Sequence, residues 1–273
     1  MTHEEELISR ARGGDRAALG DLLGSMKNLV YNLAIRMLGN PADAEDASQE
    51  ILIRLMTGLD TFKGESSFRT WVYRVASNQL LTTRKRRAEE QTESFEAMAG
   101  FLESGLAAGI PPLEDPVLIN EAKLICTSGM LLCLDRDHRL AFILGEILEL
   151  PGEEGAAVLE IAPEAFRKRL SRARTRMTEF TTSTCGLVDP QRPCRCGTQA
   201  ACAVQRGYVN PERLTWSAHP VQKEMKQAHV NEIDGMERAV ALLRGHPSYA
   251  APDSLVDGLK KLIDGGYSGL LDS

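Results

Sequence analysis

Apolar residues recur every three or four positions along most of the chain, which predicts an all-α protein. Between residues 4 and 38 this pattern is divided into two helices at Gly13 and Gly14. A third helix follows, with an apolar stripe at Ala44, Ala47, Ile51, Leu55 and Leu59. A fourth begins after the turn-like residues 63–67 and runs into a basic segment. We expect these helices to form one small domain over residues 1–88.

The third helix turns a polar and largely acidic face away from its apolar stripe. Asn40 can cap its first turn, and Pro41 suits the first helical position. The residues on the outward face are Asp43, Asp46, Gln49, Glu50 and Ile53. Taken alone, this face is better interpreted as an ordinary solvated helix surface.

The fourth helix has the opposite character, because it combines aromatic, amide and cationic side chains. It carries Trp71, Tyr73, Arg74 and Asn78, and four consecutive cations follow it, Arg84, Lys85, Arg86 and Arg87. Aromatic residues at helical spacing commonly pack in a core, and a basic run can simply keep a helix end solvated. The alternative is an interface with nucleic acid, in which cations contact phosphates and an Asn side chain reads a base edge.

The order of these features over residues 39–87 resembles region 2 of the extracytoplasmic-function sigma factors of bacterial RNA polymerase. The matching sequences are NPADAEDASQEIL, a short loop, and then FRTWVYRVASN with the basic run. The resemblance implies that the acidic helix binds the clamp helices of the largest polymerase subunit. It also implies that the loop and the fourth helix melt and read the promoter −10 element.

The same resemblance assigns the −10 residues. The loop Phe62, Lys63, Gly64, Glu65 and Ser66 would form a pocket for a flipped base, with Trp71, Arg74 and Asn78 beside it. Because Trp71 and Tyr73 lie on different faces of one helix, we expect at most one of them to touch DNA. Asn78 is the better candidate for discriminating bases, and Arg84, Lys85, Arg86 and Arg87 for phosphate contacts.

Residues 89–116 differ in composition from what precedes them. Five glutamates between residues 89 and 103 are interspersed with Gly, Ala and Ser, and the segment ends in IPPLEDP, which adds a sixth. We expect a flexible acidic linker. The resemblance would place it near the polymerase active-site cleft and RNA exit channel.

Residues 117–182 are expected to form a second helical domain, with helices at about 117–134, 138–149, 152–160 and 163–180. The last two have helix-turn-helix character, and Pro163 opens the second of them. That helix has one apolar face and the cations Arg167, Lys168, Arg169, Arg172, Arg174 and Arg176. A charged surface helix normally has mixed signs, so we favour docking in the major groove.

This domain resembles sigma region 4, which implies binding to the −35 element and to the β flap of polymerase. Arg167, Lys168 and Arg172 are the leading candidates for groove and phosphate contacts. One departure from the family is the apolar turn of Glu160, Ile161 and Ala162. Cys126 and Cys133 lie on apolar helical stretches and are expected to be core thiols.

Residues 183–273 extend beyond the length of an ordinary sigma factor of this class. Cys185, Cys194, Cys196 and Cys202 are close in sequence and could bind zinc or another thiophilic metal, undergo reversible thiol chemistry, or be incidental. His219 is a substitute ligand. Helices are expected at 221–244 and 252–263, packing on the sigma domains or gating them. The extension would thus be a regulatory module, although the sigma function requires no cofactor.

Composition supports a globular protein of two or three small domains. The chain has 273 residues, of which 43% are hydrophobic, and its net charge of −6 argues against a general nucleic-acid coat protein. No stretch has the roughly 18 apolar residues that span a bilayer, so we expect a cytoplasmic location without membrane insertion. The expected partners are core RNA polymerase and promoter DNA. An anti-sigma factor is an open alternative, which a built-in regulator could make unnecessary.

Two other classes of protein are alternatives to a sigma factor. A helix-turn-helix repressor acting without polymerase would explain the basic helix after Pro163 but not residues 39–87. A cysteine-metal enzyme has no support, because the sequence contains no HExxH motif, no P-loop and no Ser/His/Asp arrangement. We therefore expect a protein that is not an enzyme.

Overall fold

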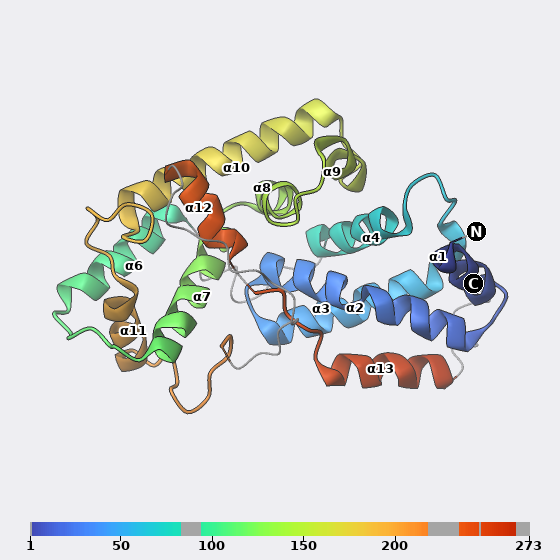
Figure 1. Cartoon of the computed structure of the whole chain (residues 1–273), viewed down its shortest axis with the longest axis horizontal. Coiled ribbons are helices and arrows are strands. Elements are labelled where there is room, and N and C mark those ends of the chain that lie inside the picture. The colour runs from blue at the N-terminus through green and yellow to red at the C-terminus, as the bar shows by residue number, and fades with distance from the viewer. Residues whose placement is uncertain (1, 83–93, 218–234, 246, 266–273) are drawn as a thin grey trace.

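The computed structural model describes the chain except for residues 1, 83–93, 218–234, 246 and 266–273. The described residues form helices and no β-strand (Figure 1), which confirms the all-α prediction. The helices of the first half are α1 (His3–Arg12), α2 (Arg16–Leu38), α3 (Pro41–Thr57), η1 (Leu59–Thr61), α4 (Phe68–Thr82) and α6 (Phe95–Ala107). Those of the second half are α7 (Pro116–Leu132), α8 (Arg136–Phe142), η2 (Ile143–Ile147), α9 (Gly152–Val158), α10 (Pro163–Thr184), α11 (Cys196–Gln205), α12 (Gly235–Arg244) and α13 (Asp253–Asp264).

The start of α1 and the end of α2 follow from local interactions. The Thr2 side chain accepts a hydrogen bond from Glu5 N, and the Glu5 side chain bonds back to Thr2 N, which forms a capping box. Helix α2 ends at Gly39, whose φ of 67° is left-handed and suits glycine. A Cβ at Gly39 would also lie 2.7 Å from Leu132 Cδ1, so a larger residue would collide with α7.

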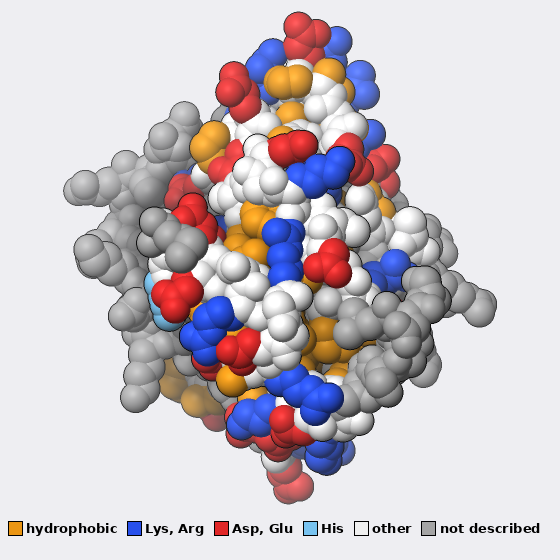
Figure 2. All heavy atoms as spheres, turned by 90° about the vertical axis from the view of Figure 1, so that its right-hand side faces the viewer, with side chains coloured by type: hydrophobic (Ala, Val, Ile, Leu, Met, Phe, Trp, Pro, Cys, Tyr) orange, Lys and Arg blue, Asp and Glu red, His pale blue; other side chains and the backbone are white. Residues whose placement is uncertain are grey.

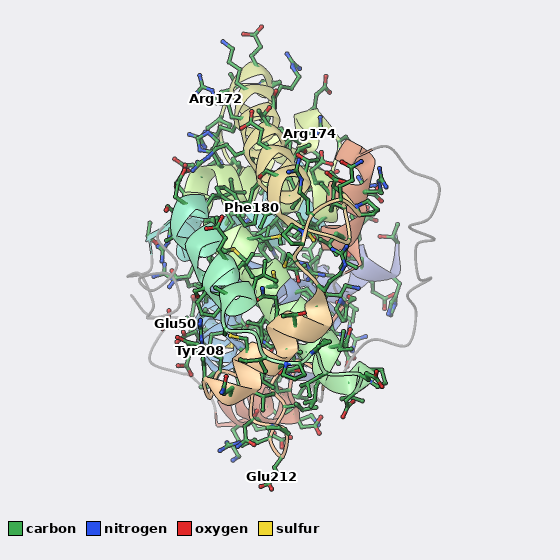
Figure 3. The ribbon with its side chains drawn as sticks, turned by 90° about the vertical axis from the view of Figure 1, so that its left-hand side faces the viewer. Glu50, Arg172, Arg174, Phe180, Tyr208 and Glu212 are labelled. Atoms are coloured by element: carbon green, nitrogen blue, oxygen red, sulfur yellow. The ribbon has the colours of Figure 1, made fainter. Side chains whose placement is uncertain are left out.

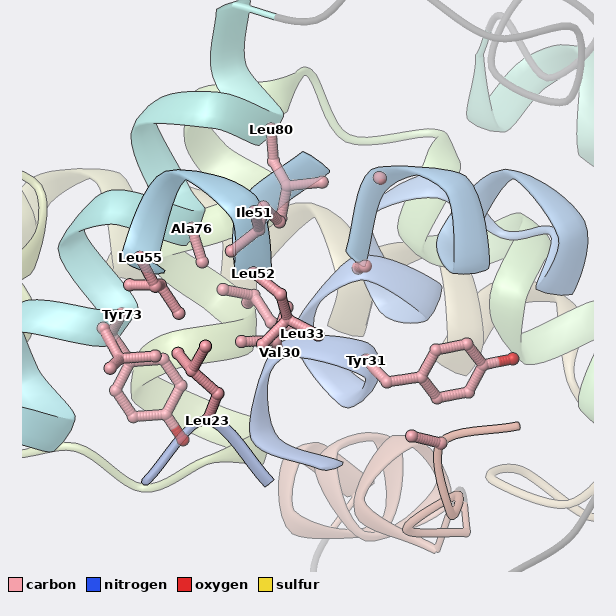
Figure 4. Packing of buried hydrophobic residues seen from close by; sticks show 14 of the residues in the cluster. Leu23, Val30, Tyr31, Leu33, Ile51, Leu52, Leu55, Tyr73, Ala76 and Leu80 are labelled. Atoms are coloured by element: carbon pink, nitrogen blue, oxygen red, sulfur yellow. The ribbon is translucent and has the colours of Figure 1, made fainter. Parts of the chain in front are cut away.

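One hydrophobic cluster spans both predicted domains. It joins the buried faces of α1 to α4 with Leu140 of α8, Val158 of α9 and Phe166 of α10. In Figure 1, α4 accordingly lies beside α8 and α9. Figure 4 shows the part of this cluster that Leu23, Val30 and Leu33 of α2 form with Ile51, Leu52 and Leu55 of α3. The two helical regions therefore share a core in this structure.

The buried guanidinium of Arg139 in α8 reinforces this contact between the two regions. It donates to the carbonyls of Leu131 (2.9 Å), Leu132 (3.1 Å) and Leu134 (2.9 Å), and also to the carbonyl of Met37 in α2. Buried backbone acceptors and a buried cation are both costly when they lack partners. One side chain thus satisfies carbonyls on both sides of the boundary.

The segment expected to be a flexible linker contains helix α6, which differs from our prediction. Ser94 caps the helix by accepting from Ala97 N at 3.1 Å. Phe95 and Leu102 are buried in a second hydrophobic cluster, and the Phe95 ring lies 5.0 Å from that of Phe180 in α10. The glutamates dominated our interpretation, but the apolar spacing of Phe95, Met98 and Leu102 is helical, and tertiary burial stabilises it.

The extension packs on both halves of the molecule. Leu243 of α12 belongs to the cluster with Phe95 and Phe180, whereas Leu255 of α13 belongs to the main cluster. Between them, Tyr249 is fully buried and lies 5.8 Å from the ring of Trp216. The expected helix at 252–263 corresponds to α13, and α12 covers the described end of the one expected at 221–244.

Candidate functional site

The acidic face of α3 is held in place by the cap that the sequence predicts. Asn40 Oδ1 accepts from Ala42 N at 2.9 Å and from Asp43 N at 3.1 Å. Asp46 and Glu50 are exposed and lie one turn apart on the same face. The other members of the predicted set, Asp43, Gln49 and Ile53, are half-buried. Two carboxylates of the predicted set are therefore exposed.

The loop between α3 and α4 is anchored by an aromatic cluster. Phe62 lies 5.4 Å from Phe68, which stacks on Trp71 at 5.5 Å, and all three are buried. Phe62 and Trp71, which we predicted to contact the −10 element, therefore lie in the core, and their rings do not present open faces. Tyr73 is also buried, at 1% exposure. The outer part of the loop, Lys63, Gly64 and Glu65, is exposed, with Ser66 partly so.

The outward side of α4 faces helix α9 and the turn after it. Thr70 Oγ1 donates to Glu154 Oε1 at 2.8 Å, and Asn78 Nδ2 donates to Glu160 Oε2 at 3.4 Å. Arg74 Nε lies 4.0 Å from Glu160 Oε1. Two of the predicted −10 residues thus contact a carboxylate of the helix-turn-helix region. The sequence alone gave no indication that these segments meet.

A cleft of about 430 Å³ lies between α3 and α4. Its lining residues are Arg54, Thr57, Val75, Asn78, Gln79 and Thr82. Gln79 Nε2 donates to Glu50 Oε2 at 2.8 Å, which connects the cleft to the acidic face. Asn78 is therefore among the residues that line this cleft. The basic residues Arg84, Lys85, Arg86 and Arg87 lie outside the described residues.

Helices α9 and α10 form the predicted helix-turn-helix. A Cβ at Gly155 would overlap the ring of Phe166, so glycine lets α10 pack closely against α9. Glu160, in the turn, adopts a left-handed φ of 53°. This conformation is uncommon for a residue with a side chain. The turn that departs from the family's polar pattern is therefore also unusual in its backbone.

The six cations predicted on α10 fall into two groups. Arg169 pairs with Asp137 at 3.3 Å, Arg174 with Glu146, and Arg176 with Asp135 at 3.7 Å. Arg167, Lys168 and Arg172 are exposed, and no ion pair to them occurs among the described residues. Figure 3 shows Arg172 near one end of the molecule, well away from Glu50 of the acidic face.

The partners of Arg174 were not predicted from the sequence. Glu146 of η2 is 4% exposed and binds both Arg174 and Arg244 of α12, the latter at 3.7 Å. Arg244 also pairs with Glu149 at 2.9 Å. Since a buried carboxylate requires a compensating charge, Arg174 has a structural partner in addition to its predicted DNA role.

The structure groups the cysteines differently from the sequence. Cys185 and Cys194 form a β-bridge, and Cys126 of α7 lies close enough to them and to Cys196 for their charges to act on it. Cys202 instead packs against Gly105 of α6. Among the described residues, no group of three or more His, Cys, Asp or Glu side chains is arranged to hold a metal ion. His219 is outside the described residues.

Burial makes the thiols of Cys126, Cys133 and Cys194 poor nucleophiles. It raises the pKa of Cys133 to about 12 and that of Cys194 to about 11, and it raises the pKa of Cys126 well above its usual range. Cys133 is a core thiol as predicted, and Cys126 packs against the same cluster. Thiolate chemistry at these positions is therefore suppressed near neutral pH.

No helix in the described part of the chain has the length and apolar character needed to cross a membrane. Over the face of the molecule shown in Figure 2, acidic and basic side chains are interspersed and do not gather into one broad basic patch.

Comparisons with known proteins indicate the family to which the chain belongs. The Sigma-70 region 2 family matches residues 22–90. The ECF RNA polymerase sigma factor SigW of Bacillus subtilis (strain 168) is 32% identical over 172 residues, which cover 61% of this chain and 90% of SigW. The ECF RNA polymerase sigma-E factor of Escherichia coli (strain K12) is 30% identical over 175 residues, covering 63% of this chain and 90% of that protein.

Two solved structures are also similar. CnrH in complex with the cytosolic domain of CnrY matches with a TM-score of 0.45 and 25% identity, covering 63% of this chain and 93% of CnrH. The sigma factor RpoE in complex with the anti-sigma factor NepR, from Bartonella quintana, matches with a TM-score of 0.40 and 20% identity, covering 59% and 94%. Since nearly the whole length of SigW and of the sigma-E factor aligns with this chain at 30% identity or more, the chain belongs to the ECF sigma factors of RNA polymerase.

Proposed function

We propose that this sigma factor binds core polymerase through the acidic face of α3 and reads the promoter with two separate surfaces. The −10 element is read by the loop at residues 62–66 together with Arg74 and Asn78 of α4. The −35 element is read by α10. The observation that carries this proposal is the exposure of Arg167, Lys168 and Arg172 without ion-pair partners in the described part of the chain.

The polymerase contact rests on Asp46 and Glu50. Both are exposed, and Glu50 accepts a hydrogen bond from Gln79 of α4. Two carboxylates one turn apart form a compact negative surface that a basic partner recognises. Reversing both to Lys should weaken binding to core polymerase at least tenfold while leaving the unfolding transition nearly unchanged.

The test is run-off transcription with purified core polymerase, combined with a direct binding measurement for each variant. The matched control reverses Glu4 and Glu6, which are exposed acidic residues of α1 outside its capping box. Equal core affinity for the Asp46→Lys/Glu50→Lys variant and the control would rule out the α3 face. A chain that binds operator-like duplex DNA but never binds core polymerase would support the repressor alternative.

We further propose that the extension regulates the sigma domains. Two contacts support this: Tyr249 and α13 pack on α2 and α3, while Arg244 of α12 pairs with Glu146. Association with an anti-sigma factor stays a separate prediction, which co-purification tests.

Metal binding by the extension also stays a prediction. The placement of the thiols favours Cys126 over Cys202 as the companion of Cys185, Cys194 and Cys196. Metal content of the purified chain, measured for Cys126→Ser and for Cys202→Ser, distinguishes the two sets. Equal content near zero in both variants and in the wild type would remove the metal hypothesis.

A further inference from the structure

The end of the extension lies on the outside of helices α2 and α3. Two parts make this contact: an extended segment at residues 247–251 and helix α13, and together they are here named the strap (residues 247–264). Figure 1 shows α13 running alongside the helices of the N-terminal half. The strap touches the same helix, α3, that carries the proposed polymerase face.

Three polar side chains of α2 bind the backbone of the extended segment. Arg36 Nη2 donates to Pro247 O at 3.1 Å. Asn32 makes two bonds to Tyr249, donating to its carbonyl at 2.7 Å and accepting from its N–H at 2.8 Å. Asn28 Oδ1 accepts from Ala251 N at 2.8 Å. The three side chains therefore bind every second residue of the strap, in antiparallel order.

The spacing of these contacts is geometrically matched. Residues four apart on an α-helix are separated by about 6 Å along the axis. Residues two apart on an extended chain are separated by about 6.6 Å. Asn28, Asn32 and Arg36 can therefore each reach the next alternate residue of the strap without distortion. The three hydrogen-bonding side chains of α2 thus match three alternate residues of the strap in register.

Helix α13 adds an apolar contact. Leu255, Leu259 and Ile263 recur every four residues, and all three are buried in the main cluster. The Ser254 hydroxyl binds the carboxylate of Glu45 in α3. A Cβ at Gly258 would lie 3.5 Å from Gln49 Nε2, so the two helices approach closely at that point.

The strap therefore reaches the edge of the proposed polymerase face. Gln49 belongs to the predicted polymerase-binding set, and Glu45 precedes it by one turn on α3. Asp46 and Glu50, the next residues around the helix, are exposed beside this contact. A helical partner docking along Asp46, Gln49 and Glu50 would meet α13 at Gln49.

The surface beneath the strap also suits a contact that can open. Asn32 and Arg36 are only 4% and 6% exposed with the strap in place, yet both are polar and would be solvated if it left. Burial lowers the pKa of Arg36 to about 10, which shows that the covered cation is held away from water. Exposing an amide row costs less than exposing an apolar core of the same area.

We propose that the strap is an internal competitor of core polymerase, which must leave α2 and α3 for full binding. The occupant of this surface in the free protein is the chain's own segment 247–264, and the occupant in the transcribing complex is polymerase. This inference rests on the proposed role of the α3 face. Its consequence is that the free chain is restrained by its own C-terminal part.

The first test loosens the strap without touching the proposed binding residues. Leu259→Lys places a charge in the apolar contact, and Asp257→Asn makes the same change of charge at an exposed position of the same helix. We expect Leu259→Lys to bind core polymerase at least tenfold more tightly than the wild type, and Asp257→Asn to match the wild type. Circular dichroism and the unfolding transition establish that both variants remain folded.

The second test holds the strap in contact with α3. The Ser254 hydroxyl reaches the carboxylate of Glu45, so a Ser254→Cys/Glu45→Cys variant places two thiols within the span of a short, cleavable bis-thiol cross-linker. We expect the cross-linked form to lose core binding and the cleaved form to regain it. Each single-cysteine variant, treated in the same way, controls for the six native thiols.

The outcomes separate this inference from the proposed function. If the wild type binds polymerase and neither loosening nor closing the strap changes its affinity, the competitor inference is wrong and the sigma assignment of the α3 face stands. If Asp46→Lys/Glu50→Lys binds as well as the wild type, the proposed face itself is wrong, and the competitor inference fails with it.

Discussion

Helices α4 and α10 carry the two predicted promoter surfaces, yet their environments differ. On α4, Arg74 and Asn78 lie against Glu160, and the nearby Thr70 binds Glu154. On α10, Arg167, Lys168 and Arg172 extend into solvent. The first surface is covered by another part of the same chain, and the second is open.

The difference shows that the same residue types can be available or occupied depending on what packs beside them. Glu154 and Glu160 provide carboxylates where the proposed −10 strand would bring phosphates, so the covering contact and DNA compete for the same cations and amides. The free chain in this closed arrangement is therefore suited to duplex contact through α10 before contact through α4.

The largest effect is expected from Arg139, which helps to hold the closed arrangement together. Arg139→Ala leaves buried carbonyls of α7 and α2 without a donor, so we expect a loss of about 3 kcal/mol in the free energy of unfolding. Urea denaturation measures it. Arg136→Ala is the comparison, because Arg136 is only half-buried and bridges the same two regions through the Leu81 carbonyl at 3.2 Å; about 1 kcal/mol is expected there. Equal losses would show that the buried carbonyls around Arg139 add nothing to a bond between the two regions.

The second-largest effect is expected from exposing the surface of α4 that Glu154 and Glu160 cover. Replacing Glu154 and Glu160 by Ala removes both carboxylates from the −10 surface. We expect binding of a single-stranded −10 oligonucleotide to become about tenfold tighter, equivalent to about 1.4 kcal/mol. Fluorescence anisotropy measures it. The Glu153→Ala/Glu164→Ala variant has the same change of net charge at exposed positions, and an equal gain in that control would mean that general charge, and not the covering contact, is responsible.

A smaller effect tests whether α10 is open. Removing either Arg167 or Arg172 should weaken binding to duplex −35 DNA and reduce the salt dependence of binding by about one counterion each. Arg169→Ala serves as the comparison, since Arg169 is already paired with Asp137. We expect a smaller change in the salt slope for that variant. Identical slopes for all three variants would contradict the division between free and paired cations.

The smallest effect is expected at the buried thiols. They report whether removing Glu154 and Glu160 also loosens the core of the molecule. Cys133 and Cys194, with pKa values raised to about 12 and about 11, should be alkylated slowly at pH 8, because the thiolate is the reactive form. In the Glu154→Ala/Glu160→Ala variant the rates should stay as slow as in the wild type. The contribution of these two buried thiols to the free energy of unfolding is complete below the unfolded thiol pKa, which is near 9. It declines as the pH rises from there toward the pKa values of the folded state. Fast alkylation at pH 8 would mean that the variant has opened more than one face.

The sequence predicted much of the local structure, because local structure depends on neighbouring residues. Asn40 and Pro41 determined the start of α3, the glycines at 13 and 14 separated α1 from α2, and Pro163 opened α10. The outward positions of Asp46, Glu50, Arg167 and Arg172 follow from the 3.6-residue period once the apolar stripe is known. The family resemblance, confirmed by the relatives, came from the same contiguous segment.

Tertiary structure decided which of those side chains are free, because that depends on residues far apart in the sequence. Glu160 meets Asn78 across 82 positions, Asn32 meets Tyr249 across 217, and Cys126 of α7 lies near Cys185 and Cys194 of the extension. Helix α6 forms where composition indicated a linker, since burial of Phe95 against Phe180 outweighs the acidic composition. Spacing within one helix determines which residues share a face. Which faces are covered is determined by packing between helices, for which periodicity carries no information.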